Sequence, residues 1–122
     1  MLAGGINLLQ VANDSTEVVV NALGVEQTLS DMTVTVTKIE QLDTMTRVDV
    51  TTRGVQGADP VEGWRLLAIA NGEVLAPLQQ QTQTCDDTDE REKQLCTVEF
   101  APTQGSVTVA YIRAGAQVQW AP

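Results

Sequence analysis

The groups most able to do chemistry in this sequence are five carboxylates within the segment 85–96. They are Asp86, Asp87, Asp89, Glu90 and Glu92. Crowded carboxylates repel one another, and hard cations such as Ca²⁺ are bound by such oxygens. Asp86, Asp87 and Asp89 are therefore candidates for a metal site.

The spacing of these carboxylates differs from that of an EF-hand loop. The glycine that such a loop needs for its sharp turn is missing, and Arg91 and Lys93 interrupt the acidic run. The other interpretation is a solvated loop tip that prevents a sheet edge from pairing with other chains.

Enzymatic activity is disfavoured because the chain contains no histidine. Histidine is the commonest general base and metal ligand, and it activates most serine and cysteine nucleophiles. Two of the carboxylates could act as a catalytic acid and base. Such a pair needs one carboxylate that is buried beside a cleft, whereas Arg91 and Lys93 indicate that this loop is solvated. We therefore expect no enzymatic activity, no catalytic residue and no cofactor.

Cys85 and Cys96 flank the acidic segment and are the two cysteines of the chain. An even count with no other soft ligand nearby indicates one disulfide, and the alternative is two reduced cysteines on neighbouring strands. A disulfide implies an oxidising compartment. We therefore expect a secreted or cell-envelope, extracytoplasmic protein.

The charge of the chain restricts its partners. Sixteen acidic and seven basic residues give a net charge of −9, which repels phosphate backbones and anionic lipids. Residues 2–11 are apolar, but they are too few to span a membrane and lack the basic leading segment of a signal peptide. We expect a protein partner or self-association, no nucleic acid and no direct membrane insertion, with any targeting segment already removed.

The elements that position these groups are strands, and Met32–Leu42 is the clearest. Met32, Val34 and Val36 alternate with threonines, which predicts a strand with one buried and one exposed face. The next large apolar residue is Ile39, so the phase changes at Thr37-Lys38, and a β-bulge would keep Ile39 on the inner face.

Further strands follow at short intervals and predict one all-β domain. Trp64–Ala70 is apolar at both parities, which is typical of a central strand buried on both faces, and Asn71-Gly72 favours a two-residue type I′ turn. The remaining expected strands are 16–23, 46–53, 73–78, 97–100, 107–113 and 117–120. Seven to nine such strands, without a persuasive helical stretch, predict an antiparallel β-sandwich.

The four aromatic residues are expected to anchor the core. They are Trp64, Phe100, Tyr111 and Trp120. Trp64 and Trp120 could instead form a surface for sugar or peptide, but large aromatic side chains on alternating strands usually pack inside small β-domains.

Several of these stretches together carry a resemblance to a known family. An early Val34–Thr37 strand, the segment 64–72 ending in Asn-Gly, the corner Phe100-Ala101-Pro102 and the final strands up to Trp120 resemble the immunoglobulin-like domains of uncharacterised bacterial lipoproteins and secreted envelope proteins. The resemblance covers roughly residues 23–120, and it implies an extracytoplasmic immunoglobulin-like β-sandwich that binds or positions other proteins. It transfers no catalytic residue, and a disulfide across the acidic segment is not a general feature of that family.

We therefore predict an N-terminal arm or edge strand over residues 1–22 and an immunoglobulin-like domain over residues 23–122. The leading hypothesis is a non-enzymatic protein-interaction module of the cell surface or secretome. The alternative is a structural subunit of an extracellular assembly or filament whose N-terminal segment is a donor strand for a neighbouring copy. A Ca²⁺-regulated domain is a third class.

Overall fold

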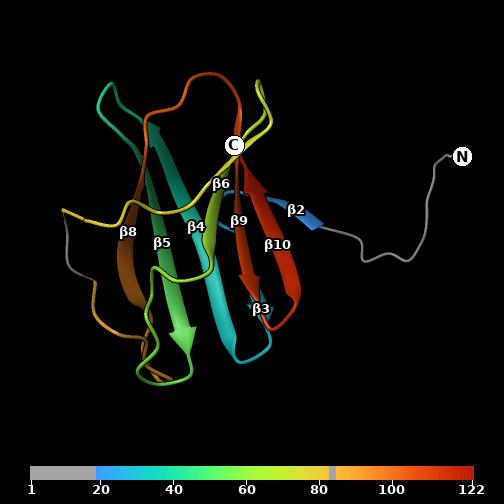
Figure 1. Cartoon of the computed structure of the whole chain (residues 1–122). Coiled ribbons are helices and arrows are strands. Elements are labelled where there is room, and N and C mark those ends of the chain that lie inside the picture. Colours follow the sequence, from blue (N-terminus) through green and yellow to red (C-terminus); the bar gives the residue numbers. More distant parts are fainter. Residues whose placement is uncertain (1–18, 83–84) are drawn as a thin grey trace, which may run out of the picture.

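The computed structural model describes residues 19–82 and 85–122 of the chain. These residues form nine strands and no helix, in two sheets that pack face to face (Figure 1). The predicted all-β sandwich of seven to nine strands is therefore confirmed. The strands are β2 (Val19–Ala22), β3 (Glu26–Leu29), β4 (Met32–Gln41), β5 (Thr46–Gly54), β6 (Trp64–Ala68), β7 (Glu73–Leu75), β8 (Gln94–Phe100), β9 (Val107–Arg113) and β10 (Ala116–Ala121).

One sheet has five strands in the order β2-β10-β9-β6-β7, and the other has four in the order β3-β4-β5-β8. Every strand pair is antiparallel except β2 with β10, where Val19 is opposite Val118 and Ala22 is opposite Ala121. The sandwich is therefore antiparallel as predicted, apart from this one parallel pairing at the edge of the five-stranded sheet. The strand β3 has no counterpart among the predicted strands.

The strands β4 and β5 form the long hairpin that the alternation predicts. Their register shifts between Val36 and Lys38, which confirms the predicted bulge. Because of this extra residue, Ile39 pairs with Val48 and packs against the core.

The core lies between the sheets and includes all four aromatic residues. Trp64, Trp120 and Phe100 are fully buried, and Tyr111 is 3% exposed. The ring of Trp64 packs against those of Tyr111 and Trp120, with centroid distances of 4.7 Å and 5.8 Å. The prediction that these rings anchor the core is confirmed, which removes the two tryptophans as a surface for sugar or peptide.

The β6–β7 hairpin differs from the prediction. The strand β6 ends at Ala68 and β7 begins at Glu73, so the connection has four residues and not the two of a type I′ turn. Only Gly72 in this connection has a positive φ, of 73°. The Asn71 side chain instead accepts a hydrogen bond from Glu73 N at 3.0 Å, which is the local contact that makes asparagine common in turns.

Residues 1–18 lie outside the described residues, as do residues 83 and 84. The first range includes most of the predicted arm, residues 1–22, and the start of the predicted strand 16–23. The division of the chain at residue 22 therefore stays a prediction. In the described part of the chain we find no apolar helix of membrane-spanning length.

Candidate functional site

The predicted disulfide is present and ties the acidic segment to the sandwich. Cys85 and Cys96 are bonded, with their Cα atoms 5.3 Å apart. Cys96 lies on β8 and is buried, and Cys85 packs against the core from outside the sheet. The bond indicates an oxidising environment, as an extracytoplasmic location provides.

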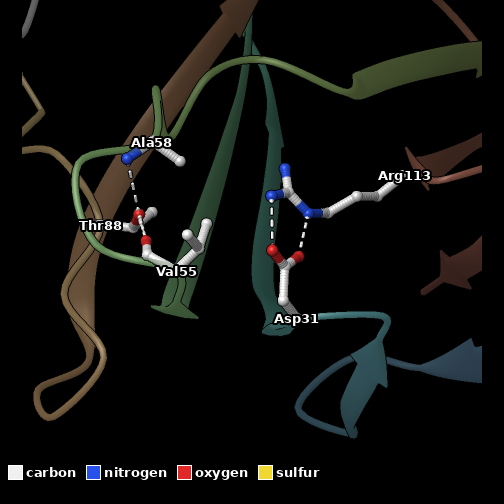
Figure 2. Close-up of polar contacts among 5 residues, drawn as sticks. All are labelled: Asp31, Val55, Ala58, Thr88 and Arg113. Atoms are coloured by element: carbon white, nitrogen blue, oxygen red, sulfur yellow. Dashed lines mark hydrogen bonds and ion pairs between the residues drawn. The ribbon is translucent and has the colours of Figure 1, made fainter.

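The acidic segment is held against the sandwich by Thr88, which the sequence did not single out (Figure 2). The Thr88 hydroxyl donates to the carbonyl of Val55 and accepts from Ala58 N at 3.0 Å. Its backbone N donates to Ala58 O at 3.0 Å, and its carbonyl accepts from Gly57 N at 2.9 Å. Thr88 is 2% exposed, so four polar contacts fix the segment at one buried point.

The acidic side chains themselves do not converge. Asp86, Asp87, Glu90 and Glu92 are exposed, and Asp89 is half-buried. The carboxylate of Asp89 accepts hydrogen bonds from Arg91 N at 2.7 Å and Glu92 N at 3.3 Å, so it stabilises the turn of its own loop. Across residues 19–82 and 85–122, no three acidic or cysteine side chains are grouped closely enough to hold a metal ion.

The same end of the sandwich carries a bidentate ion pair between the two sheets (Figure 2). Asp31, in the β3–β4 turn, accepts from Arg113 Nε at 2.5 Å and from Arg113 Nη2 at 3.2 Å. The hydrogen bond from Arg113 holds the pKa of the Asp31 carboxyl below its ordinary value. The pair links β9 to the opposite sheet, and Arg113 binds both oxygens of the Asp31 carboxylate.

Glu99 is a buried carboxylate, and it fixes the segment 78–82 along the edge strand β8. Thr82 donates to it from its backbone N at 2.6 Å and from its hydroxyl at 2.5 Å. Burial alone would raise the pKa of Glu99, but the hydrogen bonds from Thr82 and the charge of Arg47 hold that pKa below its ordinary value. Backbone contacts add to this, since Leu78 N donates to Glu99 O at 2.9 Å.

The opposite end of the sandwich has a polar hollow of ≈ 680 Å³ between three loops. Asp43 and Glu73 contribute carboxylates to its wall. Gln41 donates to Thr103 Oγ1 at 3.1 Å and to Gly105 O at 3.0 Å, so the amide that lines the hollow is already bound to its own loops. We assign no ligand to this hollow.

The outward face of the five-stranded sheet is the least charged surface among the described strands. Paired residues of a sheet point to the same side, so the registers identify eleven outward residues. One of them, Arg65, is charged. The eleven are Val20, Ala22, Arg65, Leu67, Val74, Thr108, Ala110, Ile112, Gln117, Gln119 and Ala121. We call these residues the uncharged sheet face.

The outward face of the four-stranded sheet provides a contrast within the same molecule. Seven of its strand residues are charged, namely Glu26, Lys38, Glu40, Arg47, Asp49, Arg53 and Glu99. The lack of charge is therefore specific to the outward face of the five-stranded sheet and does not follow from the composition of the whole chain. Charge-poor, apolar surfaces are typical of the centres of protein–protein interfaces.

Large apolar side chains are exposed on and beside the uncharged sheet face. Val74 is 63% exposed, Val20 is 56% exposed, and Ile69, which follows β6 with the same parity as Leu67, is 58% exposed. This corrects the prediction that the segment 64–70 is buried on both faces. Of its second apolar parity, Leu67 is half-buried and Ile69 is exposed, and both form part of the candidate interaction surface.

A small notch adjoins this face. It has a volume of ≈ 290 Å³, and Ile39, Ile69, Val107 and Ala121 form its apolar walls. No charged residue lines it, whereas Asp43 and Glu73 line the larger hollow. Gln41, Ser106 and Thr108 add polar groups to its lining.

Together these features define a disulfide-bonded β-sandwich domain with one charged and one uncharged sheet face. Among solved structures, the chain is similar to the yjhA protein from Bacillus subtilis, with a TM-score of 0.61, 11% identity, and 83% of this chain and 98% of that chain covered. It is also similar to an uncharacterized β-sandwich protein from Clostridium difficile, with a TM-score of 0.55, 10% identity, and 92% and 99% coverage. At these identities the likeness shows the fold alone. No family model and no curated protein matches the sequence.

Proposed function

We propose that this chain is a non-enzymatic, extracytoplasmic domain of the cell surface or secretome that binds a protein partner. The observation that carries the proposal is the uncharged sheet face, with one charged residue among eleven on a chain of net charge −9. An acidic molecule keeps its charges away from a surface that must lose water when a partner binds, because an unpaired buried charge is costly.

The proposed location is supported by the disulfide and by the fold. The Cys85–Cys96 bond is stable in oxidising compartments, such as those outside the cytoplasm. The immunoglobulin-like domains of secreted envelope proteins and lipoproteins, which the sequence resembles, are β-sandwiches as well. That family membership is part of this proposal.

The non-enzymatic assignment is supported by how the carboxylates are used. Asp89 caps its own loop, Asp31 pairs with Arg113, and Glu99 accepts two hydrogen bonds from Thr82. A general acid or base needs a carboxylate that is free to exchange a proton with substrate. The sequence also has no histidine to supply that role.

The experiment is cross-linking with mass spectrometry in the native compartment, comparing three forms of the chain. The Val74→Asp, Ile112→Asp variant places two charges on the uncharged sheet face and should abolish cross-links to the partner. Leu95→Asp is the matched control, because Leu95 is 79% exposed on the opposite sheet, and it should keep them. Equal cross-linking in all three forms, or substrate turnover that depends on Asp86 or Asp87, would overturn the proposal.

A second candidate function is a structural subunit whose N-terminal segment completes the sheet of a neighbouring copy. The observation that favours it is the edge strand β2, which has four residues and, among the described strands, pairs only with β10. A short strand with one neighbour can be exchanged between copies at low cost. Deleting residues 1–23 should then abolish polymers in size-exclusion chromatography and electron microscopy, whereas the interaction module predicts unchanged assembly.

A further inference from the structure

The two halves of the disulfide differ in their access to solvent. Cys96, on β8, is 6% exposed, whereas Cys85 is half-buried and lines two hollows at the surface. The first hollow, of ≈ 280 Å³, is lined by both cysteines together with residues of β4, β5 and β8. The second, of ≈ 440 Å³, lies between Cys85 and the segments 59–61 and 78–81. A small molecule can therefore approach the sulfur of Cys85 through either hollow.

Carboxylates line both of these hollows. Asp49 lines the first, and Asp59 and Asp87 line the second. Asp86, which follows Cys85 in the chain, is exposed. Among the described residues, neither hollow is lined by a lysine or an arginine. Access to Cys85 through the hollows is therefore past negative charge.

The basic residues of the chain do not neutralise these three carboxylates. The Asp49 carboxylate accepts a hydrogen bond from the Thr97 hydroxyl at 2.9 Å, and this donor is uncharged. Lys38 is opposite Asp49 on β4, but it is exposed and no ion pair joins the two. The remaining basic residues in the described part of the chain likewise form no ion pair with Asp49, Asp59 or Asp87, and they are Arg47, Arg53, Arg65, Arg91, Lys93 and Arg113.

A thiol reduces such a bond in two steps. Its thiolate attacks Cys85, the more accessible sulfur, so a new S–S bond forms and Cys96 leaves with the electron pair of the old bond and takes up a proton. A second thiolate then attacks the mixed disulfide, releases Cys85 as a thiol and leaves the two reagent molecules joined as a disulfide. The cystine gains two electrons, and the two thiols lose them.

Two features of the site slow the first step, and one of them depends on the reagent. Cys96 is buried, so it is a poor leaving group for every thiol alike. The carboxylates act according to the net charge of the attacking thiolate. That charge is two negative units for glutathione, one for mercaptoethanol and none for cysteamine, whose ammonium group offsets its sulfur. Two unit charges about 7 Å apart in water change the local concentration of an ion about threefold.

We propose that Asp49, Asp59 and Asp87 make Cys85 a site of charge-selective thiol–disulfide exchange, which cationic thiols reach and anionic thiols such as glutathione do not. This gives the carboxylates around the disulfide a role that needs no bound metal. The selectivity is a property of the isolated chain, so it does not rest on the proposed interaction function.

The test is the rate at which glutathione, mercaptoethanol and cysteamine reduce the oxidised, native chain. Each rate is divided by the rate of the same thiol on hydroxyethyl disulfide, an uncharged reference that corrects for intrinsic reactivity. At an ionic strength of roughly 10 mM, we expect glutathione to be about tenfold or more slower than cysteamine, with mercaptoethanol between them. In about 1 M salt the Debye length is about 3 Å, and the three corrected rates should converge.

Amide variants locate the effect. Asp49→Asn and Asp87→Asn should each raise the glutathione rate about threefold and leave the cysteamine rate nearly unchanged. The asparagine in Asp49→Asn can still accept the hydrogen bond from Thr97. Asp43→Asn is the matched control, because it removes one charge from the hollow at the opposite end of the sandwich and should change neither rate.

Three results would overturn the proposal. The first is equal corrected rates for the three thiols at low salt. The second is an equal gain in glutathione rate for Asp43→Asn and Asp49→Asn, since the effect would then come from the net charge of the chain. The third is a rate that does not depend on thiol concentration, because the bond would then react only after the domain opens.

Discussion

The carboxylate of Asp31 and the guanidinium of Arg113 join the two sheets of the sandwich across 82 positions of sequence. Asp31 lies in the turn between β3 and β4, and Arg113 is the last residue of β9, so the pair fixes one end of the four-stranded sheet to the five-stranded sheet. The contact uses both carboxylate oxygens, the geometry in which arginine binds carboxylates most specifically.

Asp31→Asn should lower stability slightly at neutral pH and leave it unchanged in acid. The hydrogen bond from Arg113 depresses the folded-state pKa of Asp31. A depressed pKa contributes stability that is present above the unfolded-state value, about 3.9, and is lost as pH falls through the folded-state value. Urea unfolding of both proteins at pH 7 and in acid measures this, and an equal difference at both pH values would contradict it.

Replacing Glu99 should release the segment 78–82 from β8. Glu99→Gln keeps the shape of the side chain but loses one of the acceptors for Thr82 and the charge beside Arg47, at a cost of about 1–3 kcal/mol. The control is Glu40→Gln. The Glu40 carboxylate lies 3.8 Å from Arg47 and its side chain is 40% exposed, so the change should alter stability by about 0.5 kcal/mol or less.

The Glu99 effect also has a pH dependence of known sign. Its folded-state pKa is depressed, so its contribution is present above the unfolded-state pKa, about 4.3, and is lost in acid. Chemical denaturation gives the stabilities, and hydrogen exchange of the β8 amides gives the local effect. Equal losses for Glu99→Gln and Glu40→Gln would contradict the prediction.

The alternation of apolar and polar residues predicted the strands that have one exposed and one buried face. In β4, the alternation from Met32 to Val36 and the phase change before Ile39 are local signals, and the structure contains the strand and the bulge. The burial of the aromatic residues was equally predictable, because large aromatic side chains such as Trp64 usually pack in the core of a small β-domain.

The candidate interaction surface was not predictable, because apolar residues at both parities have two explanations. Leu67 and Ile69 fit a strand covered on both sides, and they fit equally a strand whose second face is open to a partner. The structure distinguishes these two explanations. The strand β6 lies between β9 and β7, and no described residues form a further layer over the outward face of these strands. Thr88 was missed for a different reason: its partners Val55 and Ala58 are 30 or more positions away.

Removing the disulfide should destabilise the domain without changing its fold. The bond closes a short loop between positions separated by 11 residues, so Cys85→Ser with Cys96→Ser should cost about 3 kcal/mol by loop-closure entropy. Guanidinium unfolding of the variant and of the oxidised and reduced wild-type protein measures it. Thiol titration of protein from its native compartment tests the bond itself, and two free thiols there would contradict the proposed location.

Thr88→Val should destabilise the attachment of the acidic segment. Valine has nearly the same shape but no hydroxyl, so the Val55 carbonyl and the Ala58 amide each lose a partner at a site that is 2% exposed. Leaving buried polar groups unpaired costs about 1–3 kcal/mol. Thr88→Ser keeps the hydroxyl and should recover most of that loss.

The matched control is Thr28→Val, because the Thr28 hydroxyl makes an exposed hydrogen bond to Thr33 at 3.0 Å that water can replace. We expect a change of about 0.5 kcal/mol or less there. Hydrogen exchange should quicken at Gly57 and Ala58 in Thr88→Val alone, since their amides donate to Thr88. If Thr88→Val and Thr28→Val have the same stability and exchange, Thr88 does not anchor the segment, and the disulfide at Cys85 holds it without that contact.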